Sequence, residues 1–125
     1  MGEQGFTNGR TIQEMSPLLK HLYDILPQPT AHGVGQKRAL LSQAETDTNL
    51  TQIAVTTLQA GEATEEHSHP TMEEYFFFLS GEAKLTIEGN VITCHEGDFV
   101  QVKCGERHQL EAVKVTRVLT IGVQI

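Results

Sequence analysis

Basic residues are scarce in this chain of 125 residues: nine lysines and arginines stand against sixteen aspartates and glutamates, which leaves a net charge of −7. Proteins that bind nucleic acids neutralise phosphates with a basic surface, and anionic membranes attract the same kind of surface. The charge balance therefore argues against nucleic acid and against an anionic membrane as partners.

Long apolar runs are also missing from the sequence. No run approaches the roughly 20 residues that a membrane-spanning helix needs. The polar start, MGEQGFTNGR, has none of the apolar core of a secretory signal. We therefore expect a cytoplasmic protein that has no membrane partner.

Cysteine is limited to Cys94 and Cys104, with nine residues between them. They form no CxxC pair, so the pattern of a zinc ribbon is absent. A disulfide would require their two segments to lie side by side. We expect two reduced thiols that act as small buried residues.

The first part of the chain, residues 1–36, differs in pattern from the rest. Residues 1–14 mix glycine, asparagine and glutamine without a hydrophobic period, which indicates a leader. A serine-proline pair and leucines at helical spacing predict a short helix near residues 17–24. Prolines and glycines indicate a loop over residues 27–35. We expect the helix to pack on one domain formed by residues 37–125, a size that supports a single core.

The second part of the chain alternates apolar and polar residues with a period of two. Ala83, Leu85 and Ile87 alternate with polar neighbours and are followed by a tight turn, which predicts a hairpin. The expected strands cover residues 38–43, 50–58, 74–80, 83–87, 91–94, 98–102, 108–113 and 115–125. Many short strands separated by glycine turns predict an all-β sandwich or barrel.

Histidine and glutamate gather in residues 61–81, GEATEEHSHPTMEEYFFFLSG. His67 and His69 are two positions apart, so both imidazoles point the same way on an extended segment. Glu74 opens the next strand after a proline that allows a turn. His108 follows a later glycine turn and can supply a third imidazole. This ligand set suits Fe, Mn, Ni, Zn, Co or Cu better than Ca or Mg, which prefer oxygen ligands.

Two stretches resemble the paired motifs of the cupin family. Residues 61–81 match the spacing Gly-x5-His-x-His-x4-Glu-x6-Gly at every fixed position. Residues 97–108 resemble the second motif, with Lys103 where the family usually has proline. The asparagine that usually follows the last histidine by four residues is Ala112 here. The resemblance covers roughly residues 37–125.

This resemblance implies a single-domain double-stranded β-helix, the jelly-roll or cupin barrel, with a divalent transition metal ion at its mouth. It assigns the four metal ligands to His67, His69, Glu74 and His108. The ion would leave one or two positions open for a small molecule.

The direction of the strand beginning at Glu74 decides which of its side chains reach the pocket. If Glu74 points inward, Glu73 points outward, and Phe76 and Phe78 line a pocket with apolar walls. Neighbouring Glu73 is the rival ligand, but the distance to the closing glycine of the motif favours Glu74.

Several polar residues lie outside the four ligands. Glu65 has the same strand parity as the two motif histidines, and it is either a pocket-lining group or an exposed loop carboxylate. Gln101 is a second candidate for the pocket lining. The remaining histidines, His21, His32 and His95, are expected to be exposed to solvent.

Three functions fit these residues. The first is a metal-dependent enzyme that acts on a small oxygen-bearing molecule, as an isomerase or epimerase, a decarboxylase or a dioxygenase. The second is a non-catalytic module that binds or senses a small ligand, and the third is a barrel with a structural metal. No helix-turn-helix region supports a DNA-binding regulator. Outward-facing Tyr75 and Phe77 need a cover, which leads us to expect a homodimer.

Overall fold

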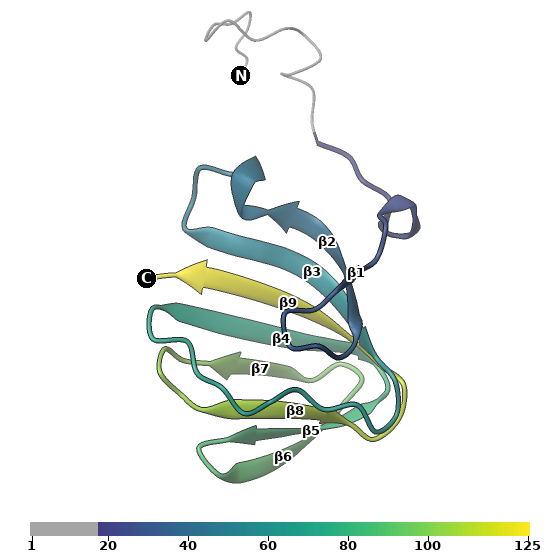
Figure 1. Cartoon of the computed structure of the whole chain (residues 1–125), viewed down its shortest axis with the longest axis vertical. Helices are drawn as coiled ribbons and strands as arrows, with labels where there is room; N and C mark the ends of the chain where they lie inside the picture. The colour runs from purple at the N-terminus through teal and green to yellow at the C-terminus, as the bar shows by residue number, and fades with distance from the viewer. Residues whose placement is uncertain (1–17) are drawn as a thin grey trace, which may run out of the picture.

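Two antiparallel sheets form the structure, a computed structural model that describes residues 18–125 (Figure 1). The large sheet has the order β1-β2-β3-β9-β4-β7 and the small sheet the order β6-β5-β8. The strands of the large sheet are β1 (Gln28–Pro29), β2 (Gln36–Ser42), β3 (Leu50–Leu58), β9 (Thr116–Gln124), β4 (Met72–Ser80) and β7 (Phe99–Val102). Those of the small sheet are β6 (Asn90–His95), β5 (Glu82–Ile87) and β8 (His108–Ala112).

The core lies between the inner faces of the two sheets. Phe78 of β4 and Val118 of β9 meet Leu85 of β5 and Leu110 of β8 in one buried cluster. In β5 the period of two is plain, because Leu85 is fully buried while Lys84 is exposed. The expected all-β fold is confirmed, and each expected strand is present to within two residues at its ends.

An extended segment, residues 61–69, runs beside β8 without being a regular strand. It contacts β8 through two isolated bridges, of which one joins His67 to His108. The His67 amide donates to the carbonyl of His108 at 3.0 Å, and the His108 amide donates back at 2.8 Å. In an antiparallel pair this exchange sets two side chains next to each other on one face.

The expected helix over residues 17–24 is wrong in extent. A single 3-10 turn, η1 (Leu22–Asp24), is present, and a second one, η2 (Gln43–Glu45), follows β2. Leu18 and Leu19 are exposed by 63% and 91%. A helix this short is not stable without an apolar face to bury, and these leucines have none.

Two other features of the first 36 residues bear on the sequence-based expectations. The strand β1 lies within the expected loop and pairs with β2, so the chain joins the large sheet before residue 37. The expected leader, residues 1–14, lies outside the described residues.

Gly81, the last glycine of the first motif, is required by the close approach of two chain segments. Its φ of +95° lies in the left-handed region, and an added Cβ would come within 2.3 Å of the Val115 carbonyl oxygen. Only glycine satisfies both conditions without strain. The turn from β4 to β5 is thereby held against the start of β9.

Within residues 18–125, the structure has no helix that is long and apolar enough to span a membrane. Both cysteines are free: Cys94 is buried in the core and Cys104 is partly exposed. Of the two thiols, Cys94 therefore has the expected role of a small core residue.

Candidate metal centre

Four side chains from three parts of the chain converge at one end of the core. His67 and His69 come from the segment beside β8, His108 begins β8, and Glu74 lies on β4 of the opposite sheet. Each offers one nitrogen or oxygen atom, and these atoms all lie within 4.8 Å of one another. The sequence-predicted ligands are therefore brought together by both sheets.

Two of the imidazoles are oriented by the backbone. Nδ1 of His67 lies 2.8 Å from the carbonyl oxygen of Glu65, and Nδ1 of His108 lies 3.0 Å from that of Glu106. A carbonyl only accepts, so each Nδ1 carries the hydrogen and donates it. The Nε2 atoms are left to face the cluster, which is how proteins commonly orient histidine ligands.

Glu74 is the negative charge at the centre of the cluster. Its Oε1 lies 3.0 Å from Nε2 of His108 and 3.3 Å from Nε2 of His69. Burial favours the neutral acid, but the hydrogen bond from His108 and the nearby imidazoles outweigh burial and lower the pKa of Glu74. Glu74 is therefore a carboxylate at neutral pH.

The histidines differ in how the site changes their pKa. Burial opposes the charge of His108, yet its hydrogen bond to Glu74 raises the pKa above the ordinary value. Burial lowers the pKa of His67, with like-charged neighbours adding to the effect. His67 is thus a neutral imidazole with a free lone pair at neutral pH.

The donor set fits a transition metal ion. Nε2 of His69 is buried, and its 3.3 Å contact with Glu74 lacks hydrogen-bond geometry, so it has no hydrogen-bond partner among residues 18–125. A buried polar atom without a partner is costly unless something unseen satisfies it. Three imidazoles and a carboxylate match the preference of Fe, Mn, Co, Ni, Cu or Zn. The cluster could therefore hold such an ion.

His32 is a residue of this site that the sequence did not reveal. Its ring centroid lies 4.2 Å from that of His67, and burial lowers its pKa. The Thr30 hydroxyl, which donates to the carbonyl of Val34, accepts the His32 amide at 3.3 Å. The expectation that His32 is exposed was wrong, because this folded-back turn carries it to the cluster. His21 and His95 are exposed, as expected.

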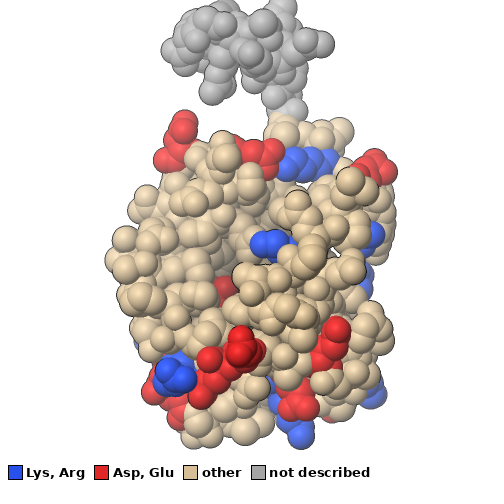
Figure 2. All heavy atoms as spheres, in the orientation of Figure 1, with Lys and Arg blue, Asp and Glu red and all other residues tan. Residues whose placement is uncertain are grey.

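A small cavity of about 100 Å³ continues inward from the cluster. His32, His67, Glu74 and His108 form part of its wall, together with Phe76. Its other lining residues come from the N-terminal turn and both sheets: Thr30, Ala31, Val34, Lys37, Gln52, Thr56, Leu58, Thr64, Leu110, Val118 and Thr120. Figure 2 shows this face of the molecule hollowed, with acidic atoms inside the hollow and basic atoms beside it.

Three residues expected in the pocket lining lie elsewhere. Phe78 shares the inner face with Phe76 but is deeper, packed in the core. Glu65 is exposed, and only its backbone carbonyl contacts the site, where it accepts a hydrogen bond from Nδ1 of His67. Gln101 lies opposite Tyr75 on the outer face, where its amide donates to Glu73 at 3.1 Å. Of the two alternatives for Glu65, the structure has the exposed loop carboxylate, and the prediction for Gln101 is wrong because β7 directs its side chain to the outer face.

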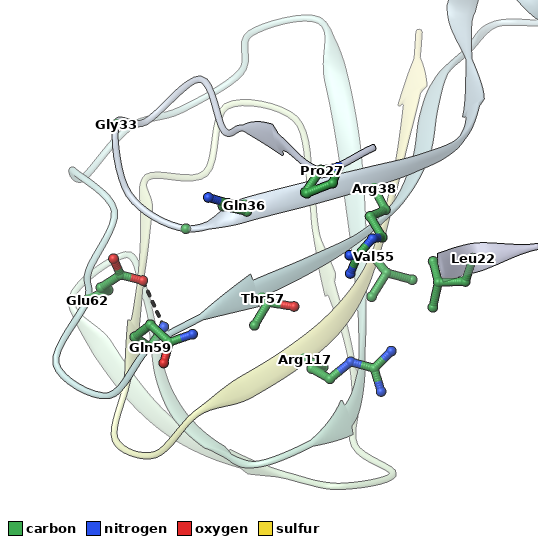
Figure 3. Close-up of a pocket in the computed structure, with 11 residues that line it drawn as sticks. Leu22, Pro27, Gly33, Gln36, Arg38, Val55, Thr57, Gln59, Glu62 and Arg117 are labelled. Atoms are coloured by element: carbon green, nitrogen blue, oxygen red, sulfur yellow. Dashed lines mark hydrogen bonds between the residues drawn. The ribbon is translucent and has the colours of Figure 1, made fainter. Parts of the chain in front are cut away.

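A second cavity, of about 410 Å³, lies between the N-terminal segment and the outer faces of β2, β3 and β9 (Figure 3). Arg38 and Arg117 line it, and each guanidinium lies within 6 Å of the ring centroid of Tyr23, at 5.3 and 5.8 Å. Nε of Arg38 also donates to the carbonyl of Ile25 at 3.0 Å. These contacts fix the N-terminal segment to the sheet. Of the two cavities, only the smaller one is lined by candidate metal ligands, which are His67, Glu74 and His108.

Comparison with known proteins agrees with this geometry. The family profile described as Cupin domain matches residues 54–122, which is more than half of the chain. The chain belongs to the cupin family. The matched range includes the four clustered residues of this cupin, the whole of strands β4 to β8 and most of β9, and it begins within β3.

Relatives of this cupin are distant in sequence. Tetracenomycin polyketide synthase protein TcmJ of Streptomyces glaucescens is 25% identical over 83 residues, which cover 66% of this chain and 56% of that protein. The cupin therefore spans little more than half of that relative's length.

Solved structures share the fold at low identity. A predicted oxalate decarboxylase from Thermotoga maritima has a TM-score of 0.80 at 20% identity, over 86% of this chain and 100% of that one. KdgF from Halomonas sp. has a TM-score of 0.76 at 13% identity, over 88% and 96%. Ectoine synthase from P. lautus has a TM-score of 0.75 at 19% identity, over 86% and 78%.

Proposed function

We propose that this cupin is a metal-dependent enzyme that acts on a small oxygen-bearing molecule. His67, His69, Glu74 and His108 hold a divalent transition metal ion. The observation that carries the proposal is the convergence of their four ligand atoms within 4.8 Å at the end of a cavity. A site that only stabilised the fold would not need that adjoining space.

The cavity has room for a reactant beside the ion. Three histidines and a glutamate leave one or two positions open on a five- or six-coordinate ion. An ion bound here supplies Lewis-acid chemistry, the polarisation of a carbonyl or hydroxyl oxygen, or redox chemistry if the metal is iron, manganese or copper. Isomerisation, decarboxylation and oxygenation are the reaction classes that use these properties.

The chain's own residues orient the reactant and handle its protons. Phe76 and Leu110 give the cavity apolar walls that exclude water from the bound molecule. His32 is held as a neutral imidazole beside the cluster, so its free ring nitrogen can accept a proton from a molecule bound there. The turn that carries His32 sets the distance between that base and the reactant.

Elemental analysis of the purified protein tests the ligand assignment. We expect about one transition metal ion per chain, and we expect the His67→Ala, His108→Ala double variant to lose it. His95→Ala is the matched control, because His95 is exposed and lies outside the cluster. Full metal content in the double variant would remove the assignment.

Catalysis requires a separate measurement. Oxygen-uptake and sugar-isomerisation screens on the metal-loaded protein should reveal turnover that the double variant lacks. Stoichiometric tetrahedral zinc without an exchangeable water would count against an enzyme and favour a structural metal.

We also propose that the protein is a cytoplasmic homodimer. Both thiols are free, which suits a reducing compartment. On the outer face of the large sheet, Val55, Leu119, Phe77 and Phe99 occupy one row of paired residues. Phe77 and Phe99 are exposed by 39% and 61%, an apolar surface that a second copy would cover. Light scattering at micromolar concentration tests this, and a monomer would contradict it.

A further inference from the structure

Lys37 is the one lysine or arginine in the wall of the metal cavity. It lies on β2 opposite Thr56 of β3, which in turn lies opposite Val118 of β9. Val118 is fully buried in the core, so this row of side chains faces inward. Lys37 is therefore directed into the barrel and is only partly exposed.

Within the described part of the chain, the ammonium group of Lys37 has one hydrogen-bond partner. Its Nζ donates to Oε1 of Gln52 at 2.9 Å, and no aspartate or glutamate among residues 18–125 forms an ion pair with it. An ammonium group carries three donors, so two have no acceptor among residues 18–125. A half-buried charge without a counterion is unfavourable. An anion in the cavity would supply both the acceptor and the charge.

The contact with Gln52 brings the ammonium group toward the metal ligands. Gln52 lies opposite Gly122 of β9, and Gly122 lies opposite Glu74 of β4. Two strand spacings separate Gln52 from Glu74, about 10 Å between backbones. The side chains of Thr51 and Met72 pack over Gly122 and fill part of this interval. Lys37 nevertheless lines the same cavity as three of the four candidate metal ligands, His67, Glu74 and His108.

The size and charge of that space define what it can hold. The cavity of about 100 Å³ is small, which favours a small molecule over a long or bulky one. Lys37 and Glu74 are the charged residues of the lining beside the histidines. A divalent ion would leave the cavity with a net positive charge, because Glu74 is the one carboxylate to offset it.

We infer that the substrate is a small carboxylic acid with a hydroxyl or keto oxygen next to its carboxylate. The carboxylate pairs with Lys37, and the neighbouring hydroxyl or keto oxygen reaches the metal. This inference rests on the proposed metal-dependent function. It narrows the oxygen-bearing molecule to an anion and makes Lys37 the residue that selects it.

Calorimetric titration with a matched pair of probes tests the inference. Lactate carries the carboxylate and the adjacent hydroxyl, and lactamide has nearly the same shape without the charge. The titrations use zinc-loaded protein whose metal content has been measured, for the wild type and for Lys37→Met. Lys84→Met is the control, because Lys84 is exposed on β5 and its loss changes the net charge equally.

We expect Lys37→Met to weaken lactate binding by about 10- to 100-fold, the usual worth of a charge-assisted hydrogen bond. Lactamide binding should change less than about twofold, and Lys84→Met should change neither. Lys37→Arg retains the charge and should retain the preference for lactate over lactamide. Equal losses for both probes, or equal effects of Lys37→Met and Lys84→Met, would overturn the inference.

Failure of the proposed function gives a different result. If zinc does not bind, that function is wrong, and the same titrations are run on the metal-free protein. The preference for lactate over lactamide should still depend on Lys37 there, with weaker binding overall. If that preference is absent in both states, the lysine does not select an acid.

Discussion

Two adjacent glutamates on β4 show how differently the two faces of one sheet act. Glu74 points inward, where burial is outweighed by His108 and the other imidazoles, so its pKa is lowered. Glu73 points outward and has a lowered pKa because the Tyr75 hydroxyl and the Gln101 amide donate to it, at 2.6 and 3.1 Å. Both are carboxylates at neutral pH. Only the carboxylate of Glu74 lies beside the histidine nitrogens, where it could bind a metal ion together with them.

The largest expected effect is the difference in stability loss when an aromatic residue is removed from the inner or from the outer face of β4. Phe76→Ala should lower the free energy of unfolding by about 3–5 kcal/mol, because Phe76 is buried and its loss leaves a cavity. Phe77→Ala should lower it by about 1 kcal/mol, because Phe77 is 39% exposed. Urea unfolding of both variants measures the difference. Equal losses would mean that a second copy covers the outer face at the concentration used.

The next effect concerns the two carboxylates and metal affinity. Glu74→Gln removes a charged ligand and should weaken zinc binding by at least about 100-fold, whereas Glu73→Gln should change it less than about twofold. Competition with a chromophoric chelator gives both values. Circular dichroism checks that each variant is folded. Comparable losses in the two variants would show that Glu74 acts only through the charge of the segment.

The smallest effect is the pH dependence of the metal-free protein. The raised pKa of His108 contributes stability that is present below its unfolded pKa, about 6.5, and is lost as the pH rises through the folded value. The lowered pKa of Glu74 contributes stability that is present above its unfolded pKa and is lost as the pH falls through the folded value. The pair therefore stabilises the protein most between these limits.

Unfolding free energies across this range, measured with chelator present, check the sign. The free energy of unfolding of the wild type should exceed that of Glu74→Gln by the largest amount at about pH 6 and by a smaller amount at about pH 8. The lowered pKa values of His32 and His67 give the opposite slope, but both residues remain in every protein compared. Glu73→Gln should differ from the wild type by a constant amount, because its partners, Tyr75 and Gln101, are uncharged there. A constant difference for Glu74→Gln as well would refute the coupling to His108.

The barrel and the candidate metal ligands could be predicted from sequence because they depend on short patterns, namely alternation within strands and the spacing within motifs. A period of two determines which side chains of β4 and β5 point inward, and the resemblance to the cupin motif, with its fixed distance to Gly81, favoured Glu74 over Glu73 as a ligand. The motif glycine Gly81 is explained by its φ and by the approach of Val115. Such constraints act within a few residues and leave a readable pattern.

The rest of the site depends on how separate segments come together. His32 reaches the cluster because the turn at Thr30 folds back over the barrel mouth, and no periodic pattern marks that turn. Lys37 did not stand out in the sequence, because its inward direction depends on the pairing of β2 with β3. Leu18 and Leu19 belong to a run of apolar residues with helical spacing, but they have no surface to pack on. Tertiary contact decides all of these cases.

The bridge between His67 and His108 has a mechanical consequence. It joins a short, irregular segment to the small sheet by two backbone hydrogen bonds, while Glu74 belongs to the large sheet. An ion held by all of these residues would act as a clasp across the open end of the barrel. Its binding energy would add to the stability of that end in proportion to the logarithm of the free ion concentration. The supply of the ion would thereby set how often the mouth of the barrel opens.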